Sequence, residues 1–413
     1  MYILFLSHYF PPEVNAPASR TYEHARRWVQ EPNVAVTVIT NHPNHPYGVL
    51  YPGYKNRPLT KENFDGIHVR RVKTYLAPNA GFARRILNHL FFMMAAIIDA
   101  IQLPRPDLVL ATSPQFFCAL AGYLISRLKR CPFVFELRDI WPESIVAVGA
   151  IKPGLTIRLL ERLELFLYRQ ASLIIPVTDS FKESLIRRGI PAEKIQVIKN
   201  GVDLSFFQPK EAPAHLRGEL GAKDKFVAAY IGTVGMAHAV DKIVLAAEQL
   251  QHQNNVLFLI LGEGAQKKAI QEMAGSRRLK NVRVLPGVGK EEVRDYYALS
   301  DINLVTLKKN DLFSTVIPSK VFEIMAMGRP ILTTVDGECR KIIENAGAGI
   351  FVEPENVERL ADTISELSHK AHLLTTMGES GRHYVEKYFS REVLAMNYLN
   401  LLYKVAGYAP EYF

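Results

Sequence analysis

The sequence lacks the features of disulfide-stabilised, metal-binding and membrane-spanning proteins. Its 413 residues include only three cysteines, Cys118, Cys131 and Cys339. They are odd in number and lack the paired spacing of a zinc site, so we expect free thiols in a reducing compartment. No run of about 18 apolar residues occurs, which argues against an ordinary transmembrane helix. Residues 1–6 have no basic segment before them and are expected to form a strand, not a signal peptide.

Common nucleotide-binding motifs are missing as well. The chain contains neither a Gly-x-Gly-x-x-Gly run nor a Walker A run, so the usual dinucleotide-binding and phosphate-loop signatures are excluded. The composition is otherwise that of a globular protein, with 48% apolar and 22% charged residues. The length is typical of two or three domains.

Positive charge is unevenly distributed along the chain. Residues 1–200 contain 25 basic and 15 acidic residues, whereas residues 201–413 contain 25 and 26, so the first half holds all of the net charge of +9. A basic half beside a near-neutral half suggests that one domain faces an anionic partner, such as lipid, phosphate or nucleic acid. The basic clusters are not interleaved with the aromatic residues of single-stranded nucleic-acid grooves, so no nucleic-acid partner is expected.

Short apolar runs alternate with longer helical patterns along the whole chain. Strands are expected at 2–6, 34–40, 108–111, 133–137 and 173–177, and again at 226–231, 256–261, 282–285, 302–305 and 330–333. This alternation predicts an α/β fold with parallel sheets covered by helices on both faces. We expect two Rossmann-like domains, 1–205 and 206–390, facing a central cleft that is the default ligand site. The segment 391–413 is expected to pack back on the first domain.

The segment 82–103 is the most distinctive predicted helix. On a helical wheel an arc of about 140° holds Arg84, Arg85, Asn88, His89, Asp99 and Gln102, and large apolar residues such as Phe91 fill most of the rest. One interpretation is a helix packed on the sheet. The other is an in-plane membrane anchor, with Phe91 on its apolar side and Arg84 and Arg85 at anionic headgroups. Further basic clusters, including Arg70-Arg71-Lys73, favour the membrane interpretation.

Two segments of the first half have polar residues at the ends of predicted strands. The loop after strand 2–6 and the helix that follows it contain Glu13, Asn15, Ala16 and Arg20. The free N–H groups at the start of that helix could receive an anion. Arg138 and Asp139 directly follow strand 133–137, where ligands of parallel sheets bind. Each segment also has a structural interpretation, because Pro-rich loops often serve as turns and Arg–Asp pairs often form salt bridges.

Four segments of the second half follow strands in the same way. The first three are glycine turns that contain Gly232, Thr233 and Gly235, then Gly262 and Glu263, then Val288. In the fourth, Ser319 and Lys320 lie in the first turn of a predicted helix, where phosphate is favoured. Glu323 lies one turn on, sharing a face with Lys320. The two side chains could form an ion pair, or Lys320 could hold a diphosphate while Glu323 accepts hydrogen bonds from sugar hydroxyls.

These segments, together with Asn200-Gly201-Val202-Asp203, resemble the family-4 retaining glycosyltransferases of the GT-B fold over nearly the whole chain. The opening loop, residues 138–144 and Pro318-Ser319-Lys320 are most similar to the branch that includes the bacterial WbuB-type transferases. That branch works on surface polysaccharide with N-acetylfucosamine-type donors. The resemblance implies a nucleotide-sugar site in the second domain and an acceptor site in the first.

The resemblance also implies roles for single residues. Glu323 matches the glutamate that holds the ribose hydroxyls, and the main chain at Val288 would meet the base. Ser319 and Lys320 fall where the family has diphosphate-binding amides. The turn at 12–16 would approach the diphosphate and the acceptor.

The chain departs from the family pattern at several positions. Thr315 stands where the family has the first glutamate of its E-x7-E motif. Thr233 and His238 stand where it has a diphosphate-binding arginine and lysine, and the Gly-Gly of the first loop is missing. These departures remove a sugar contact and two positive charges from the family pattern.

We therefore expect Lys320 to supply the missing positive charge, aided by Arg138 or Arg20. The departing UDP would be stabilised electrostatically by Lys320 and helix N-termini, and Asp139 would orient the donor sugar or the acceptor. No Asp-x-Asp motif occurs, so neither a metal nor another cofactor is expected. A double-displacement nucleophile is unsupported, because no carboxylate pair with glycosidase spacing can be assigned.

The predicted function is the retaining transfer of a sugar, such as N-acetyl-L-fucosamine, from a UDP-sugar to an undecaprenyl-diphosphate-linked saccharide in surface polysaccharide biosynthesis. The protein is expected to bind an anionic membrane surface peripherally, at the cytoplasmic face of the inner membrane. Two other classes stay open. A GT-B nucleotide-sugar epimerase or hydrolase would ionise the same bond without a second substrate, and the loss of glutamate at Thr315 would suit a non-catalytic scaffold.

Overall fold

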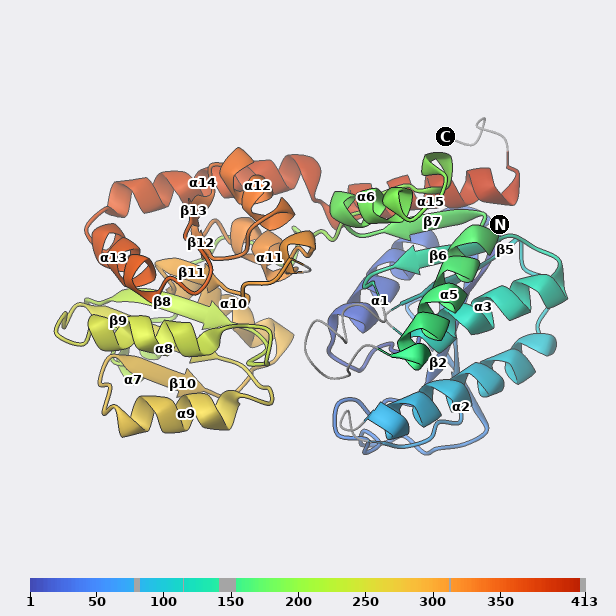
Figure 1. The fold of residues 1–413 in the computed structure, drawn as a ribbon, viewed down its shortest axis with the longest axis horizontal. Coiled ribbons are helices and arrows are strands. Elements are labelled where there is room, and N and C mark those ends of the chain that lie inside the picture. Colours follow the sequence, from blue (N-terminus) through green and yellow to red (C-terminus); the bar gives the residue numbers. More distant parts are fainter. Residues whose placement is uncertain (78–81, 114, 141–153, 312, 409–413) are drawn as a thin grey trace. The chain divides into compact units, whose positions relative to one another are not determined.

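The computed structural model describes residues 1–77, 82–113, 115–140, 154–311 and 313–408, without the side chains of Phe82, Ala83, Arg85 and Thr156 (Figure 1). Its backbone contacts separate two compact units, residues 1–199 with 391–413 and residues 200–390. We call them the first and second domains. The predicted boundary after residue 205 lies a few residues further along the chain than this division.

A seven-stranded sheet forms the centre of the first domain, in the order β3-β4-β2-β1-β5-β6-β7. The strands are β1 (Tyr2–Leu6), β2 (Ala35–Asn41), β3 (Leu59–Phe64), β4 (Ile67–Val72), β5 (Leu108–Thr112), β6 (Phe133–Leu137) and β7 (Leu173–Pro176). Neighbours are parallel except β3 and β4, which pair antiparallel. Because side chains alternate along a strand, Ile3 and Phe5 enter one core while Leu4 and Leu6 enter the other.

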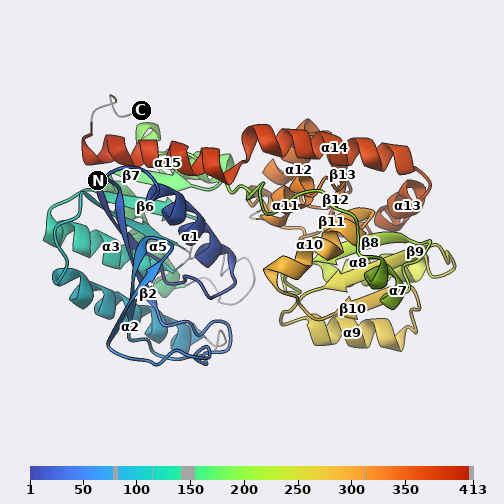
Figure 2. The same cartoon turned by 180° about the vertical axis from the view of Figure 1, so that it is seen from behind.

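Helices cover both faces of this sheet (Figures 1 and 2). The helices α1 (Ala16–Trp28) and α15 (Arg391–Ala406) pack on the face of Ile3 and Phe5. The other face carries α2 (Phe82–Ile101), α3 (Phe116–Lys129), α5 (Leu155–Gln170) and α6 (Asp179–Arg187). The buried indole of Trp28 donates a hydrogen bond of 2.9 Å to the carbonyl of Ala395. The C-terminal helix is thus part of the first domain.

The β3–β4 hairpin is absent from the strands predicted from the sequence, because Arg70 and Arg71 interrupt its apolar pattern. Both arginines are buried. Arg70 donates from two nitrogens to Asp99 of α2, at 2.6 and 2.5 Å, and Arg71 donates to Glu62 at 2.8 Å. The prediction that this basic cluster faces a membrane is therefore wrong for these two residues, whose charges are neutralised inside the domain.

Helix α2 packs on the sheet through the polar arc of its wheel. Asn88 and Asp99 are buried together with Phe92, Ala96 and Ala100. Five residues of the apolar arc, which would ordinarily form the packed side, are instead 40% to 61% exposed: Leu87, Phe91, Met94, Ile98 and Ile101. Arg84 is exposed at the start of the helix, and the side chain of Arg85 lies outside the described residues. Across the described ranges, no helix is long and apolar enough to span a bilayer.

A six-stranded parallel sheet forms the second domain, in the order β10-β9-β8-β11-β12-β13. Its strands are β8 (Phe226–Ile231), β9 (Val256–Leu261), β10 (Val282–Leu285), β11 (Ile302–Val305), β12 (Ile331–Thr333) and β13 (Gly349–Phe351). Only β13 was not predicted. It is a three-residue strand whose first residue, Gly349, contributes no side chain to an apolar pattern.

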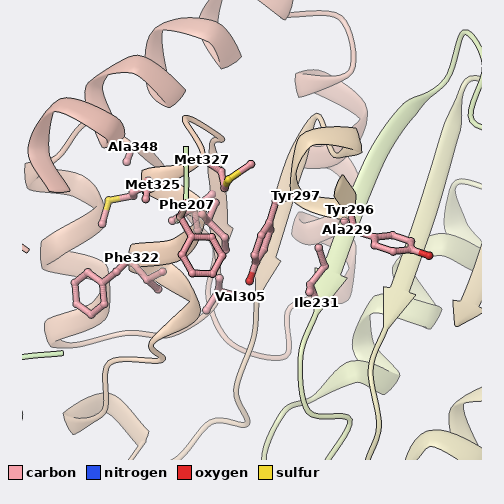
Figure 3. Packing of buried hydrophobic residues seen from close by; sticks show 14 of the residues in the cluster. Phe207, Ala229, Ile231, Tyr296, Tyr297, Val305, Phe322, Met325, Met327 and Ala348 are labelled. Carbon is pink, nitrogen blue, oxygen red and sulfur yellow. The ribbon is translucent and has the colours of Figure 1, made fainter. Parts of the chain in front are cut away.

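Helices again cover both faces of the second sheet. One layer contains α8 (Val240–Gln249), α9 (Lys267–Ser276) and α13 (Val357–Leu367). The other contains α10 (Lys290–Leu299), α11 (Lys320–Ala326) and α12 (Glu338–Asn345). The domain also contains α7 (Ala214–Glu219), α14 (Ala371–Tyr388) and the short turn η2 (Phe313–Thr315). Figure 3 shows the second of these cores, in which Tyr297 of α10 lies beside Phe207 and Ile231.

Candidate active site

The loops after β8 and β9 lock together at the carboxyl end of the second sheet. Gly232 N–H donates to the Leu261 carbonyl at 2.9 Å, and Val234 N–H donates to the Glu263 carbonyl at 2.8 Å. A Cβ on Gly262 would stand 1.8 Å from the carbonyl oxygen of Gly232. A Cβ on Gly264 would stand 2.3 Å from that of Val234, and both glycines have positive φ. Only glycine permits this approach of two backbones.

The amine of Lys320 reaches this glycine loop from α11. Its Nζ lies 4.0 Å from the centre of the Tyr230 ring, a cation–π geometry. It also lies 2.6 Å from the position that a Cβ on Gly232 would take. The residue as a whole is only partly covered, but the amine lies deep among protein atoms. This desolvation lowers the pKa of Lys320 to about 7, against an opposing effect of Glu323.

Thr233 and His238, which stand where the family has an arginine and a lysine, lie in the same loop. Thr233 is exposed and its carbonyl accepts a hydrogen bond of 2.6 Å from the Tyr230 hydroxyl. Burial, and then the charge of Lys320, lower the pKa of His238 to about 4, so its imidazole is neutral at neutral pH. Gly235 makes room for that ring, because a Cβ there would stand 3.1 Å from His238 Nδ1. Of Thr233, His238 and Lys320, only Lys320 can carry a positive charge near neutral pH.

Glu323 lies on the same short helix as Lys320, one turn further on. The buried Tyr297 donates a hydrogen bond of 3.0 Å to Glu323 Oε2. Desolvation, and then the neighbouring carboxylate, raise the pKa of Tyr297 well above its ordinary value, so the phenol keeps its proton and remains a donor. Figure 3 shows Tyr297 anchored among the apolar residues of the core, which fixes the direction of this hydrogen bond.

Three further residues that were predicted to bind the donor, Glu263, Val288 and Ser319, also lie in the second domain. Glu263 Oε1 accepts from Lys267 at 2.7 Å and from the Gly287 amide at 3.1 Å, and these bonds lower its pKa. Val288 is half-buried against the core. Ser319 is the residue before α11, and Thr315 ends the turn η2. For Glu263 these contacts explain its position without a ligand, and its donor-binding role stays a prediction.

In the first domain, Glu13, Asn15 and Ala16 organise the loop between β1 and α1. The buried Glu13 accepts from the amides of Asn44 and His45, both at 2.9 Å, and burial raises its pKa. Asn15 caps α1 by accepting from the Ala18 amide at 2.9 Å, and Ala16 is the first residue of that helix. These contacts give the loop a fixed shape, and a contact with diphosphate or acceptor stays a prediction.

Arg20 is built into the interior of the first domain. It donates to Glu136 at 2.8 Å and to the carbonyls of Ile198 and Lys199 at 2.8 and 3.0 Å, and it is 6% exposed. An anionic ligand would have to compete with these partners. The geometry therefore favours a structural role over the predicted contact with diphosphate.

Arg138 and Asp139 follow β6 at the carboxyl edge of the first sheet. The Arg138 amide donates to Ser113 Oγ at 2.7 Å. Burial lowers the pKa of Arg138 to about 10, so the guanidinium is still charged at neutral pH, and its Nη1 has no hydrogen-bond partner in the described ranges. Asp139 is half-buried. Residues 141–144 of the same predicted motif lie outside the described residues.

Sequence reasoning missed Tyr230 and Tyr297, which hold the two central side chains of the second domain's site. Tyr230 could have been found, because a tyrosine inside an apolar strand needs a partner for its hydroxyl. Tyr297 carries no comparable signal in α10. In the described part of the chain, no three His, Cys, Asp or Glu side chains gather to hold a metal ion; metal independence of a reaction stays a prediction.

Two glycosyltransferase family models match most of this chain. The model named Glycosyltransferase Family 4 matches residues 18–206, and the model named Glycosyl transferases group 1 matches residues 214–384. The putative colanic acid biosynthesis glycosyl transferase WcaI of Escherichia coli K12 is 24% identical over 412 residues, which cover 97% of this chain and 99% of that protein.

Solved structures show the same fold. Sucrose-phosphate synthase from Thermosynechococcus elongatus superposes with a TM-score of 0.77 at 16% identity, over 98% of both chains. Anabaena Alr3699/HepE, solved in complex with UDP-glucose, superposes with a TM-score of 0.72 at 17% identity, over 98% of this chain and 100% of that one. These likenesses confirm the predicted fold class, two Rossmann-like α/β domains as in GT-B glycosyltransferases.

The locked glycine loops yield a first prediction. Gly262→Ala should lower the free energy of unfolding by about 1–3 kcal/mol, because the new methyl group meets backbone that cannot move aside cheaply. Gly275→Ala in α9 is the matched control, since a Cβ there has nothing within 4 Å and alanine favours a helix by up to about 1 kcal/mol. Urea unfolding followed by circular dichroism measures both. Equal stability of the two variants would contradict the close approach of the loops.

Proposed function

The chain belongs to the glycosyltransferases that join a family-4 domain to a group-1 domain, and from this premise we propose that it transfers a sugar from a UDP-sugar to a lipid-linked saccharide with retention of configuration. The observation that carries the proposal is the amine of Lys320, held against Gly232 and over Tyr230. A cation in this loop is suited to the diphosphate of a nucleotide sugar. The reaction needs such a cation because negative charge develops on the departing UDP.

The amine of Lys320 is desolvated, so a bound ligand would change its protonation state. An electrostatic interaction is stronger in a desolvated position than in water. An amine that is already held in place also needs no reorganisation during the reaction. With a pKa of about 7 in the free protein, the amine is partly neutral before binding. A diphosphate beside it would favour the protonated form. Lys320 would then supply the charge that Thr233 and the neutral His238 do not.

Glu323 would hold the ribose of the donor. Its carboxylate is oriented by the hydrogen bond from Tyr297, and a carboxylate accepts hydrogen bonds from vicinal hydroxyls through its two oxygens. Ser319 and Lys320 would lie at the diphosphate, and the main chain at Val288 at the base. In the first domain, Asp139 and Arg138 would orient the reacting groups.

The substrates follow from the relatives and from the resemblance. A relative matched over nearly its whole length is named for colanic acid biosynthesis, and a structural neighbour was solved with UDP-glucose. These support a UDP-sugar donor and a role in surface polysaccharide biosynthesis. The similarity of residues 138–144 and 318–320 to the WbuB-type branch supports an N-acetylated amino sugar such as N-acetyl-L-fucosamine. The acceptor would be an undecaprenyl-diphosphate-linked saccharide.

A donor screen tests this function. The full chain is incubated with an undecaprenyl-diphosphate-linked N-acetylglucosamine acceptor and a panel of UDP-sugars, with and without EDTA. We expect transfer from at least one UDP-N-acetylamino sugar, an α-linked product by NMR when the donor is α-linked, and the same rate in EDTA. Consumption of donor without acceptor would favour an epimerase or hydrolase. The absence of turnover with every donor would contradict transfer.

The pKa of Lys320 yields a pH prediction. The amine is charged below about pH 7 and loses its charge as the pH rises through that value, so donor affinity should fall as pH rises. We expect the dissociation constant of UDP-N-acetylglucosamine, measured by calorimetry, to rise by up to about tenfold per pH unit above 7. His238, with a pKa of about 4, does not titrate in this range.

Two variants separate Lys320 from other causes of pH dependence. Lys320→Met should bind the donor weakly at all pH values and give a flat profile. Lys268→Met on α9 is the control, because its side chain is 88% exposed, and it should keep the wild-type profile. A wild-type profile in Lys320→Met would refute the diphosphate contact.

The same function calls for access to a lipid-linked acceptor, and we further propose that the first domain binds an anionic membrane surface through α2 and its neighbours. The five exposed apolar residues of α2 are continued by Leu124 and Leu128 of α3 and by Leu155, Leu159 and Phe166 of α5. Helix α3 packs against both α2 and α5, and the three helices cover the same face of the sheet (Figure 1).

The charges beside this apolar surface favour anionic lipid. Among the described side chains of these three helices, the strongly exposed ionisable ones are all arginines: Arg84, Arg127, Arg158, Arg162 and Arg169. Apolar side chains in the acyl boundary with arginines at the headgroups describe an interfacial protein. Each basic residue near an anionic surface contributes about 1 kcal/mol. This supports a peripheral location at the cytoplasmic face of the inner membrane.

Vesicle sedimentation tests the membrane surface. Phe91→Ser with Ile98→Ser should reduce binding to phosphatidylcholine–phosphatidylglycerol vesicles by about tenfold or more, since each side chain contributes about 1–2 kcal/mol when it leaves water. Arg84→Glu should weaken binding and make the remaining binding less sensitive to salt, because one attraction to anionic headgroups is lost. Leu373→Ser and Lys268→Glu, at exposed positions in the second domain, are the controls and should leave binding unchanged. Unchanged partitioning of the Phe91 and Ile98 variant would refute this surface.

A further inference from the structure

A cluster of rings lies at the carboxyl ends of β1 and β2 in the first domain. His8 follows β1, and its ring centre is 5.0 Å from those of Tyr9 and His89 and 4.9 Å from that of Phe92. These three contacts are edge-to-face. Tyr9 in turn meets His45, from the loop after β2, at 4.9 Å. Rings from a strand end, a neighbouring loop and α2 therefore form one connected group.

The cluster has a buried part and a partly exposed part. His8 is 3% exposed and Phe92 is fully buried. Tyr9, His45 and His89 each keep part of their surface exposed. We call these three residues the aromatic shelf. The carboxyl ends of strands are where parallel α/β sheets bind their ligands, so the aromatic shelf stands at a functional edge of the sheet.

The loops that carry the aromatic shelf are held by buried polar contacts. Glu13 joins them by accepting from the amides of Asn44 and His45, and the Tyr51 hydroxyl donates to the His45 carbonyl at 3.0 Å. Arg71, which is fully buried, donates to the Asn41 carbonyl at 3.2 Å. Burying a carboxylate and a guanidinium has a large desolvation cost. Loops held in one shape in this way are typical of a recognition surface. A loop that only joins two elements does not need such contacts.

The chemistry of the aromatic shelf suits a neutral ligand with both apolar and polar groups. Burial, and then the neighbouring His89, hold the pKa of His8 well below its ordinary value, so the buried part of the cluster is uncharged at neutral pH. His8 Nε2 lies 2.8 Å from Asn41 Nδ2, which gives the ring a fixed partner. Imidazole and phenol groups can donate and accept hydrogen bonds, and their ring faces pack against C–H groups.

From this geometry we propose that the aromatic shelf, Tyr9, His45 and His89 over His8 and Phe92, is a carbohydrate subsite that stacks one pyranose ring of the acceptor saccharide. This rests on the proposed function and deepens it, because it assigns the sugar part of the acceptor to named residues of the first domain. A pyranose presents an apolar C–H face that can pack against the rings. Sites for small ligands combine such an apolar lining with a few polar groups.

Saturation-transfer NMR on the full chain tests the subsite without requiring turnover. The probes are methyl β-N-acetylglucosaminide, methyl α-L-fucoside and uridine, each with UDP in excess to occupy the donor site. We expect saturation transfer to at least one glycoside, reduced about tenfold in Tyr9→Ala and in His45→Ala. Tyr9→Phe should retain most of the signal because it keeps the ring. Since Tyr9 also packs on His8, His45→Ala is the second, independent variant.

Tyr47 provides the matched control. It lies in the same loop as His45 and is 73% exposed, so Tyr47→Ala should bind the glycosides as the wild type does. An undiminished glycoside signal in Tyr9→Ala and His45→Ala, or a signal from uridine alone that these variants abolish, would overturn the proposal. So would the lack of binding of both glycosides to the wild type.

The subsite and the proposed transfer can fail separately. Glycoside binding that depends on Tyr9 and His45 in a protein with no transferase activity would support the subsite and refute the transfer. If transfer occurs, Tyr9→Ala and His45→Ala should raise the acceptor KM about tenfold and leave the donor KM unchanged. Transfer with an unchanged acceptor KM would overturn the subsite alone.

Discussion

The site in the second domain depends on one contact, between the amine of Lys320 and the glycine loop after β8. Lys320 Nζ lies over the Tyr230 ring, in space that a Cβ on Gly232 would crowd. The loop keeps that path because Gly262 lets the neighbouring strand end approach it. The position removes water from the amine, which lowers the pKa of Lys320. Burial of His238, and then the charge of Lys320, lower the pKa of His238.

Much of this arrangement could be predicted from the sequence, and the rest depends on tertiary contacts. The alternation of apolar runs predicted the strands of both sheets except β3, β4 and β13 at their edges, and glycines after strands identified the loops. The pairing of Lys320 with Tyr230 could not be predicted, since it joins segments about 90 residues apart. The same holds for Arg70 and Arg71, whose acidic partners lie on another helix and strand. The orientation of α2 differs from that of an ordinary amphipathic helix. Its polar side faces the sheet, where Asp99 accepts from Arg70.

These burials change what the net charge means. Arg20, Arg70 and Arg71 are inside the first domain and paired with carboxylates, so they contribute little to an external field. Exposed arginines on α2, α3 and α5 contribute to the positive surface and lie on the same helices as exposed apolar side chains. The first domain therefore has two different surfaces, an apolar one edged by arginines and an aromatic one. That division suits an acceptor that is part lipid diphosphate and part sugar.

The most direct test of this account is the pKa of the Lys320 amine itself, measured by NMR from the side chain of selectively 13C-labelled lysine and assigned with Lys320→Met. The account predicts a value of about 7 in the free protein and a clear rise when UDP-N-acetylglucosamine is bound. A value near that of an exposed lysine, unchanged by the donor, would contradict it.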